Sequence, residues 1–294
     1  MSKIGFIGVG IMGRPMAGHL RAAGHELFLV KHRTTLPKEL VDGGAVECAS
    51  SKAVAQQAEI VITMVPDTPH VEAVLFGRDG VAEGLSAGKT VVDMSSISPI
   101  ETKSFANRIN ELGCDYLDAP VSGGEVGAKN AALTIMVGGP QATFDKIKPL
   151  FELMGKSITL VGDNGAGQTA KVANQIVVAL TIEAVSEALV FAAKAGVDPA
   201  RVRDALMGGF AGSRILEVHG ERMIKRTFDP GFRIELHQKD LNLALAGARA
   251  LNMSLPNTAA TQELFNACAA HGWGGMDHST LVRALELLAN HEVG

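Results

Sequence analysis

The sequence predicts an α/β protein, with a doubly wound, mostly parallel sheet followed by an all-helical C-terminal domain. Two observations predict this architecture. Short β-rich runs alternate with helical segments of crossover length through the first half of the chain. Beyond about residue 161 no further run reads convincingly as a strand, and helix-forming residues dominate. A long helix is expected to join the two domains.

The expected strands share short lengths, apolar residues and flanking turn formers. They cover residues 4–7, 27–30, 60–65, 90–93, 116–117, 133–137 and 158–161. The segments between the earlier strands are long enough for crossover helices, which implies parallel neighbours with helices on both faces of the sheet.

The run 162–167 (GDNGAG) is too rich in glycine and turn formers to continue either element, so it marks a domain junction. We expect a first domain at 1–163 and a second at 164–294. From Ala166 to Ala195 apolar residues lie nearly all round a predicted helix of about 45 Å. Asp198 and Pro199 then predict an N-cap and a first-turn proline for the next helix.

Composition excludes several classes of protein. The chain has 294 residues, of which 47% are hydrophobic and 20% are charged, and its net charge is -4. This profile is typical of a compact soluble protein, and it has no basic excess for nucleic-acid binding. The N-terminal apolar run is too short and glycine-rich for a signal peptide, and no segment suggests a bilayer span. We therefore expect a cytoplasmic protein without a membrane partner.

Cysteine and histidine spacing predicts neither disulfides nor a metal site. Cys48, Cys114 and Cys268 lie far apart and form no CxxC pair. The nine histidines include no HExxH, and His271 and His278 flank a glycine-rich turn without an obvious third ligand. No metal is expected.

A glycine-rich fingerprint directly follows the first expected strand and precedes a helix predicted over 12–22. It reads Gly8-Val9-Gly10-Ile11-Met12-Gly13, a GxGxxG motif. The first glycine permits a tight turn, the second lets a pyrophosphate approach the backbone, and the third lets helix and strand pack closely. In this context the motif predicts a Rossmann-like dinucleotide site that includes Ile11 and Met12.

The end of the second expected strand discriminates between the two nicotinamide dinucleotides. An acidic residue there would bind the adenosine ribose and repel a 2′-phosphate, yet the sequence reads Lys31-His32-Arg33-Thr34. The guanidinium of Arg33, with His32 and the Thr34 hydroxyl, suits a phosphate dianion. NADP(H) is therefore the expected cofactor, with NAD(H) possible.

Two later strand ends are expected at the same edge of the sheet. Ligands of open α/β sheets bind outside the carboxyl ends of the strands. The loops after residues 63 and 93 should therefore contact the nicotinamide half of the cofactor, the first of them through Met64, Val65 and Pro66.

Two segments carry the expected chemistry. Ser122, Gly123 and Gly124 offer a hydroxyl and exposed backbone N–H groups that can bind a carboxylate. Lys171, Asn174 and Gln175 fall at i, i+3 and i+4 on one face of the long helix. A cation and two amides beside a nicotinamide suggest carbonyl reduction, in which Lys171 stabilises the growing negative charge and donates the proton.

Five motifs, GFIGVGIMGRPM, DMSSISP, DAPVSGG, GAGQTAKVANQ and PGFRIELHQKDL, follow one another over essentially the whole chain. In this order they resemble the β-hydroxyacid dehydrogenase (3-hydroxyisobutyrate dehydrogenase-like) family. The resemblance implies Lys171 as the catalytic residue with Asn174 as its substrate-side neighbour. It also implies Ser122, Gly123 and Gly124 at the substrate carboxylate, and Ser96 and Lys239 at the cofactor. The helical domain would complete the site and mediate assembly into a homodimer or homotetramer.

The resemblance implies a small hydroxyacid or semialdehyde as substrate, with reduction of 2-hydroxy-3-oxopropanoate to D-glycerate as the leading expectation. Oxidation of 3-hydroxyisobutyrate, 3-hydroxypropionate or serine stays open, because a methyl-bearing substrate needs an apolar pocket and a hydroxylated one a polar partner. Relatives that favour NAD usually carry Asp where this chain has His32. A module that binds NADP(H) without turnover is a rival of another class, although such a module needs no proton donor.

Overall fold

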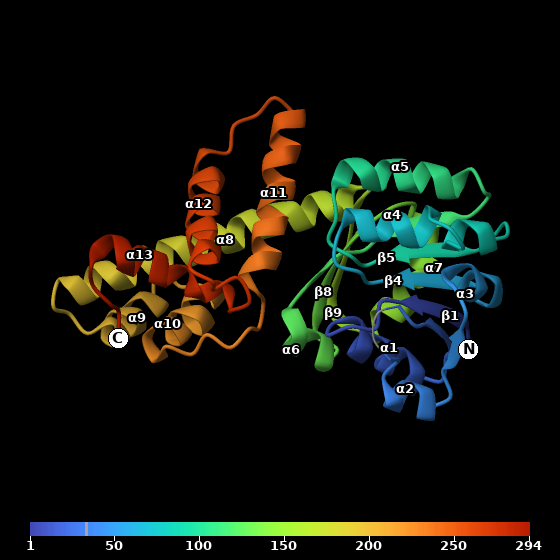
Figure 1. The fold of residues 1–294 in the computed structure, drawn as a ribbon, viewed down its shortest axis with the longest axis horizontal. Helices are drawn as coiled ribbons and strands as arrows, with labels where there is room; N and C mark the ends of the chain where they lie inside the picture. The colour runs from blue at the N-terminus through green and yellow to red at the C-terminus, as the bar shows by residue number, and fades with distance from the viewer. Residues whose placement is uncertain (33–34) are drawn as a thin grey trace. The chain divides into compact units, whose positions relative to one another are not determined.

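The computed structural model describes residues 1–32 and 35–294 (Figure 1). The chain forms two compact units, Met1–Lys171 and Val172–Gly294. The division falls within helix α8 (Ala166–Lys194), close to the domain boundary that the sequence predicts at 163/164. The functional division of the chain at 163/164 stays a prediction.

The first unit contains a nine-stranded sheet within the described residues, in the order β3-β2-β1-β4-β5-β6-β8-β7, with β9 paired to β8. Pairing is parallel from β3 through β6, and β8 runs antiparallel to β6 and β7. The strands are β1 Lys3–Ile7, β2 Glu26–Val30, β3 Val46–Cys48, β4 Ile60–Thr63, β5 Thr90–Asp93, β6 Asp115–Asp118, β7 Val121–Ser122, β8 Leu133–Gly138 and β9 Gly155–Gly162. The predicted doubly wound sheet is confirmed, whereas the short strands β3 and β7 were not predicted.

Helices cover both faces of this sheet. One face packs against α1, α2, α6 and α7, and the other packs against α3, α4 and α5; Figure 1 shows α1 and α2 on one side of the strands and α4 and α5 on the other. The bounds are α1 Gly13–Ala22, α2 Lys38–Asp42, α3 Ser51–Gln57, α4 Thr68–Phe76, η1 Val81–Gly84, α5 Pro99–Asn110, α6 Gly124–Lys129 and α7 Gln141–Phe151.

Strand alternation explains how the sheet serves two cores. Ile60 and Ile62 of β4 belong to the first core, whereas Val61 between them belongs to the second. Successive side chains of a strand point to opposite faces, so a strand buried on both sides is apolar throughout. The apolar runs that predict strands in this sequence are therefore the mark of a sheet that is covered twice.

The second unit is helical, as predicted. Its core contains apolar side chains such as Ile182, Leu241, Phe265 and Leu281. Asp198 caps the second helix as expected, because its Oδ1 accepts a hydrogen bond of 2.9 Å from the backbone N–H of Ala200. Besides most of α8, its helices are α9 Pro199–Met207, η2 Leu216–Gly220, α10 Glu221–Lys225, α11 Ile234–Ala250, α12 Pro256–Ala270, η3 His278–Thr280 and α13 Leu281–Ala289.

Helix α8 corrects one expectation. Its 29 residues include a stretch of mean hydropathy 2.0, and by length and composition the helix is long and apolar enough to cross a membrane. The sequence-based statement that no segment suggests a bilayer span was therefore wrong for this helix. Of that stretch, 39% is buried within the protein, and core helices of proteins outside membranes share this composition.

Candidate active site

The glycine-rich loop lies at the point where strand order reverses, because β1 pairs with β2 on one side and with β4 on the other. Gly8 has φ 103°, and a Cβ there would lie 2.2 Å from the carbonyl oxygen of Met64. A Cβ on Gly13 would lie 1.9 Å from the carbonyl oxygen of Gly8. At Gly10 a Cβ would meet no described atom within 4 Å. The first and third glycines thus satisfy packing, and the second leaves open the approach that a pyrophosphate needs.

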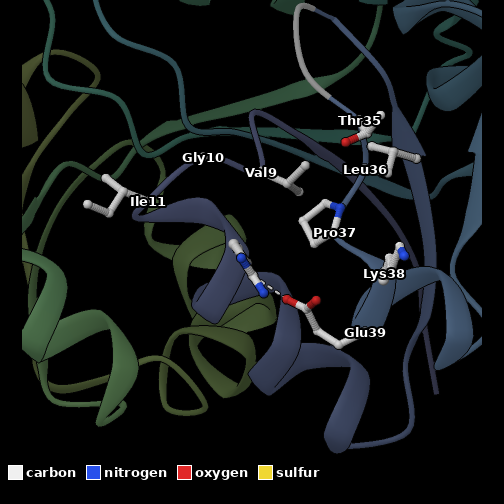
Figure 2. A pocket seen from close by; sticks show the side chains of 9 residues that line it. Val9, Gly10, Ile11, Thr35, Leu36, Pro37, Lys38 and Glu39 are labelled. Atoms are coloured by element: carbon white, nitrogen blue, oxygen red, sulfur yellow. Dashed lines mark hydrogen bonds and ion pairs between the residues drawn. The ribbon is translucent and has the colours of Figure 1, made fainter.

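A pocket of about 570 Å³ lies beside this loop (Figure 2). Within it the guanidinium of Arg14, at the start of α1, pairs with the carboxylate of Glu39 on α2. His32 is exposed and lies three positions before Thr35, which lines the pocket. The predicted cofactor-binding residues Arg33 and Thr34 lie outside the described residues. The pocket is lined by Val9, Gly10, Ile11, Arg14, Thr35, Leu36, Pro37, Lys38 and Glu39.

The loops that follow β4 and β5 are joined to one another and to β1. The backbone N–H of Met64 donates to the carbonyl of Ile7 at 2.8 Å. The N–H of Val65 donates to the hydroxyl of Ser95 at 3.0 Å, one residue before the predicted cofactor residue Ser96. Met64, Val65 and Ser96 thus lie at the same carboxyl edge of the sheet as the glycine-rich loop, with Pro66 next along the chain.

A buried carboxylate holds this edge together. Asp93, the last residue of β5, accepts hydrogen bonds at Oδ1 from the Thr63 hydroxyl at 2.8 Å and from the Ser95 N–H at 3.1 Å. Burial raises the pKa of Asp93 to about 6, and these hydrogen bonds oppose the rise because they favour the charged form. Asp93 therefore fixes the loop that leads to Ser96, a role that the sequence reasoning missed.

A second carboxylate anchors helix α8, which carries Lys171. Asp118 ends β6, and its two oxygens accept hydrogen bonds from the backbone N–H groups of Gly165 at 2.7 Å and Gln168 at 2.9 Å. The negative charge also meets the positive end of the helix dipole. Burial raises the pKa of Asp118, although these N–H donors act in the opposite direction. Sequence reasoning treated Asp118 only as part of a motif, not as a site residue.

Gln168 joins the same helix turn to the loop after β5. Its Oε1 accepts from the N–H of Ile97 at 3.1 Å, and its Nε2 donates to the carbonyl of Ser95 at 2.7 Å. The buried amide therefore bonds to the residues on both sides of Ser96. One turn further along α8 the side chain of Lys171 is buried, with 7% of its surface exposed.

The predicted carboxylate-binding segment forms a tight turn between β7 and α6. Ser122 ends β7 and is partly buried, while Gly123 and Gly124 have φ values of 130° and 59°. Both values lie in the region that favours glycine, so the backbone can present its N–H groups here without a strained side chain. Ser122, Gly123, Gly124 and Lys171 all belong to the first unit.

In the second unit a side-chain network joins three predicted site residues. Asn174 donates from Nδ2 to Oε1 of Gln175 at 2.8 Å, and Gln175 donates from Nε2 to Oδ2 of Asp240 at 2.6 Å. The other oxygen of Asp240 lies 2.9 Å from Nζ of Lys239. The buried carboxylate of Asp240 thus orients Gln175 and Lys239 together. In the sequence, the only indication that Asp240 is a site residue was its place beside Lys239 in the PGFRIELHQKDL motif.

Comparisons with known proteins agree with this geometry. Residues 3–162 match the NAD binding domain of 6-phosphogluconate dehydrogenase, and residues 165–285 match the NAD-binding region of NADP-dependent 3-hydroxyisobutyrate dehydrogenase. The chain belongs to the 3-hydroxyisobutyrate dehydrogenase family. The family resemblance and the dinucleotide-binding fold predicted from the sequence are confirmed, and members of this family use NAD(P).

Individual relatives cover nearly the whole chain. The 2-hydroxy-3-oxopropionate reductase of Escherichia coli K12 is 66% identical over 294 residues, or 99% of each chain. The 3-hydroxyisobutyrate dehydrogenase of Pseudomonas aeruginosa is 34% identical and covers 96% of this chain and 97% of its own. A solved structure of the Mycobacterium tuberculosis 3-hydroxyisobutyrate dehydrogenase with L-serine has a TM-score of 0.89 and 31% identity, with 97% and 99% of the two chains covered.

The roles of the second and third glycines can be separated by substitution. Gly10→Ala should keep the thermal stability of the parent but weaken NADPH binding at least about tenfold, because the methyl group occupies the approach of the pyrophosphate. Gly13→Ala should lower the free energy of unfolding by about 1–3 kcal/mol, because its Cβ meets backbone. Thermal unfolding and fluorescence titration with NADPH measure both effects.

Gly18→Ala is the matched control, since Gly18 lies in α1 and a Cβ there also meets no described atom within 4 Å. It should leave both stability and NADPH affinity near those of the parent. Unchanged NADPH affinity in Gly10→Ala would contradict the assignment of this loop to the pyrophosphate.

Proposed function

We propose that this chain reduces 2-hydroxy-3-oxopropanoate (tartronate semialdehyde) to D-glycerate with a nicotinamide dinucleotide. The observation that carries the proposal is the 66% identity to the E. coli 2-hydroxy-3-oxopropionate reductase over 99% of both chains. Substrate preference depends on many side chains of a site, and identity at this level, sustained over the full length, favours a shared substrate. The open glycine-rich loop and the buried Lys171 supply the two parts that the reaction requires.

The residues have distinct roles in this proposal. The bound dinucleotide supplies the hydride that reduces the aldehyde carbon. Lys171 hydrogen-bonds the carbonyl oxygen, stabilises the charge that grows there and donates the proton that completes the hydroxyl. The Ser122 hydroxyl and the N–H groups of Gly123 and Gly124 bind the substrate carboxylate. Asn174 and Gln175 bind its single hydroxyl group, with Asp240 holding Gln175 in place.

We infer a preference for NADP(H), with NAD(H) accepted less well. The loop 31–34 carries three basic side chains and a hydroxyl, and the acid that would bind an unmodified ribose is replaced by His32. Glu39 does bring a carboxylate to the neighbouring pocket, but Arg14 pairs with it and neutralises its charge. The cofactor contacts proposed are those of the glycine-rich loop, His32 to Thr34, Met64 to Pro66, Ser96 and Lys239.

The remaining proposals concern organisation. We propose that residues 1–163 form the dinucleotide-binding domain, and that residues 164–294 form the substrate and oligomerisation domain. The second unit has an exposed apolar groove of about 640 Å³ between α8 and α13, in which Phe191 and Leu288 are 76% and 77% exposed. A second copy of this chain would cover such a surface, which favours a homodimer or homotetramer in the cytoplasm.

Steady-state assays at 340 nm test substrate and cofactor together. With tartronate semialdehyde we expect kcat/KM to be at least about tenfold higher for NADPH than for NADH, because charged hydrogen bonds to a phosphate are worth about 1.5–3 kcal/mol. Arg33→Gln should remove most of this difference by slowing the NADPH reaction. Arg78→Gln, at a side chain that is 97% exposed, should not. Turnover confined to 3-hydroxyisobutyrate would overturn the substrate, and equal use of NADH would overturn the preference.

Lys171→Ala tests the mechanism. We expect kcat/KM for semialdehyde reduction to fall about 10²–10⁴-fold, the usual contribution of a positioned proton donor, while NADPH affinity stays close to that of the parent. Lys156→Ala makes the same chemical change at an exposed position on β9 and should have no effect on rate. Full activity in Lys171→Ala would refute its role as the proton donor.

Leu288→Glu tests assembly, because a charge in the apolar groove between α8 and α13 should prevent a second copy from covering it. We expect the parent to have at least twice the mass of one chain in light scattering, and the variant to have a lower mass. Leu251→Glu places the same charge at an apolar side chain that is 73% exposed outside the groove. A monomeric parent would contradict the proposed oligomer.

A further inference from the structure

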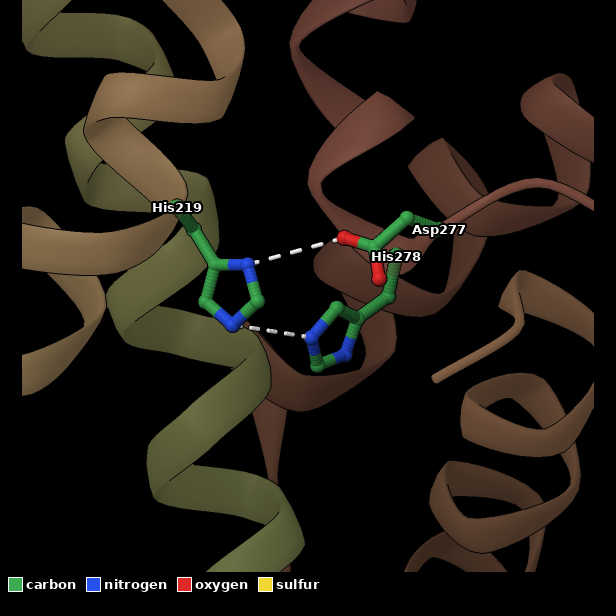
Figure 3. Close-up of side chains that lie close together, drawn as sticks. All are labelled: His219, Asp277 and His278. Atoms are coloured by element: carbon green, nitrogen blue, oxygen red, sulfur yellow. Dashed lines mark hydrogen bonds and ion pairs between the residues drawn. The ribbon is translucent and has the colours of Figure 1, made fainter. Parts of the chain in front are cut away.

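The second unit contains a group of three histidines and a carboxylate that the proposed reaction does not use. His219 lies in the π-helical turn η2, His237 lies in α11, and Asp277 and His278 lie where η3 begins. Figure 3 shows His219 facing Asp277 and His278, with an interaction toward each. His237 and His278 are buried, and the side chain of His219 is 16% exposed. Three segments that are distant in the sequence therefore place imidazoles in one polar cluster.

The imidazoles form a continuous chain of short contacts that begins on helix α8. Nε2 of His237 lies 3.2 Å from the backbone carbonyl of Gln175. Nδ1 of His237 lies 3.0 Å from Nδ1 of His278, and Nε2 of His278 lies 3.1 Å from Nε2 of His219. Nδ1 of His219 then lies 3.5 Å from Oδ1 of Asp277.

The carbonyl at one end, together with a neutral His237, fixes the direction of every hydrogen bond in the chain. A carbonyl only accepts, so Nε2 of His237 carries a proton, and Nδ1 of a neutral His237 then accepts. Nδ1 of His278 must therefore donate, which leaves its Nε2 to accept from Nε2 of His219. At the far end a proton on Nδ1 of His219 faces a carboxylate, whereas a lone pair there would be repelled by it. In this arrangement Nδ1 of His278 and both ring nitrogens of His219 are donors, and Nδ1 of His237 and Nε2 of His278 are acceptors.

Asp277 is a fixed anion at the end of this chain. Its Oδ2 lies 2.7 Å from Nη1 of Arg222 and accepts from the N–H of Gly231 at 2.9 Å. Its Oδ1 accepts from the hydroxyl of Ser279 at 2.6 Å. Burial alone would raise the pKa of Asp277, but the hydrogen bonds from His219 and Ser279 and the nearby His278 hold it well below its ordinary value.

The same residues have the spacing of a metal site, which the sequence pattern did not predict. His219, Asp277 and His278 each offer a ligand atom within 4.8 Å of the others. However, both oxygens of Asp277 already accept hydrogen bonds, and the guanidinium of Arg222 lies against one of them. Shared protons account for imidazole separations of 3.0 and 3.1 Å. The donor set therefore fits a hydrogen-bonded chain better than it fits a cation.

We propose that the His237–His278–His219 chain is a positioning relay that holds α8 at Gln175, and that protonation of its inner histidines breaks the relay and limits activity in acid. The proposal rests on the proposed function, in which Asn174 and Gln175 bind substrate. If His237 becomes doubly protonated, its Nδ1 can no longer accept from His278, and two N–H groups then face one another. The same conflict arises at His278, so one added proton disconnects Gln175 from Asp277.

The charges around the inner histidines set the sign of the pH dependence. Burial lowers the pKa of His278 well below 6.5, His237, His219 and Arg222 lower it further, and Asp277 opposes them. On α11 the charged residues within three positions of His237 are Glu235, Lys239 and Asp240, of which the last two pair with each other. Phe232 and Phe265 contribute apolar rings. The unfolded chain therefore binds a proton at His278 that the native protein does not, and stability should fall as the pH drops below about 6.5.

Nitrogen-15 NMR of the full-length, histidine-labelled protein reads the relay directly, without substrate. We expect His237 to be protonated only at Nε2, His278 only at Nδ1, and His219 at both nitrogens at pH 7.5. The opposite tautomer of His278 would overturn the proposal. Addition of one equivalent of Zn²⁺ should leave these signals unchanged, and a shift of the His219 and His278 signals together would identify a metal site instead.

Two substitutions at His278 separate positioning from packing. His278→Gln keeps one donor and one acceptor but cannot titrate, so its kcat/KM at pH 7.5 should stay within about twofold of the parent. The parent's acid loss of kcat/KM follows the lowered pKa of His278 in the native protein, well below 6.5, and should disappear in this variant. His278→Leu leaves buried partners unsatisfied and should lower kcat/KM about tenfold or more at every pH. His271→Gln, at an exposed histidine, should keep the parent's pH profile.

The outcomes separate this proposal from the proposed function. If His278→Gln retains the parent's acid limb in both activity and thermal unfolding, the relay is wrong even when semialdehyde reduction is confirmed. If the expected tautomers and the acid-dependent loss of stability are found in a protein that does not reduce the semialdehyde, the relay is supported and the proposed function is refuted. If His278→Leu fails to fold, the NMR measurement on the parent chain still decides whether the relay has the proposed tautomers.

Discussion

The bond between Asp118 and the start of helix α8 is the constraint on which the rest of the structure depends. One carboxylate at the end of β6 accepts from the N–H of Gly165, just before α8, and from the N–H of Gln168 in its first turn, and the helix carries Lys171 one turn later. Each charged hydrogen bond of this kind is stronger than a neutral one. The helix can therefore begin at only one place on the sheet edge, and the position of Lys171 relative to that edge follows from backbone geometry.

Register makes this arrangement possible. Ile7, Thr63, Asp93 and Asp118 are aligned across β1, β4, β5 and β6, so four strands end at the same level. Two of these residues, Asp93 and Asp118, are buried carboxylates. Burial raises the pKa of both, because it disfavours the charged form. Their N–H and O–H donors offset that cost, and as a result the loops after β4 and β5 and the start of α8 share one polar layer.

The features that could be predicted from the sequence are those that depend on residues close together in the chain. Apolar runs located the long strands, and the glycine spacing located the dinucleotide loop, because each signal depends on neighbours in the chain. Strand β3 has only three residues, two of them exposed, and so lacked an apolar run. Asp118 and Asp240 could not be assigned, since their partners lie about 50 and 65 residues away. The histidine cluster was missed for the same reason, because three distant segments converge there.

The partners of helix α8 along its length explain its composition. Its first three turns carry the polar side chains that the carboxylates and imidazoles hold: Gln168 bonds to the β5 loop, and Gln175 bonds to Asp240 through its side chain and to His237 through its carbonyl. Beyond Gln175 the helix is mostly apolar, and the polar side chains that remain include Ser186, which donates to the carbonyl of Ile182, and Lys194, which donates to the carbonyl of Ala289. That second part packs into the helical core at Ala179, Ile182 and Leu189 and exposes Phe191. High hydropathy in this helix therefore reflects the division of one element into a positioning end and a packing end.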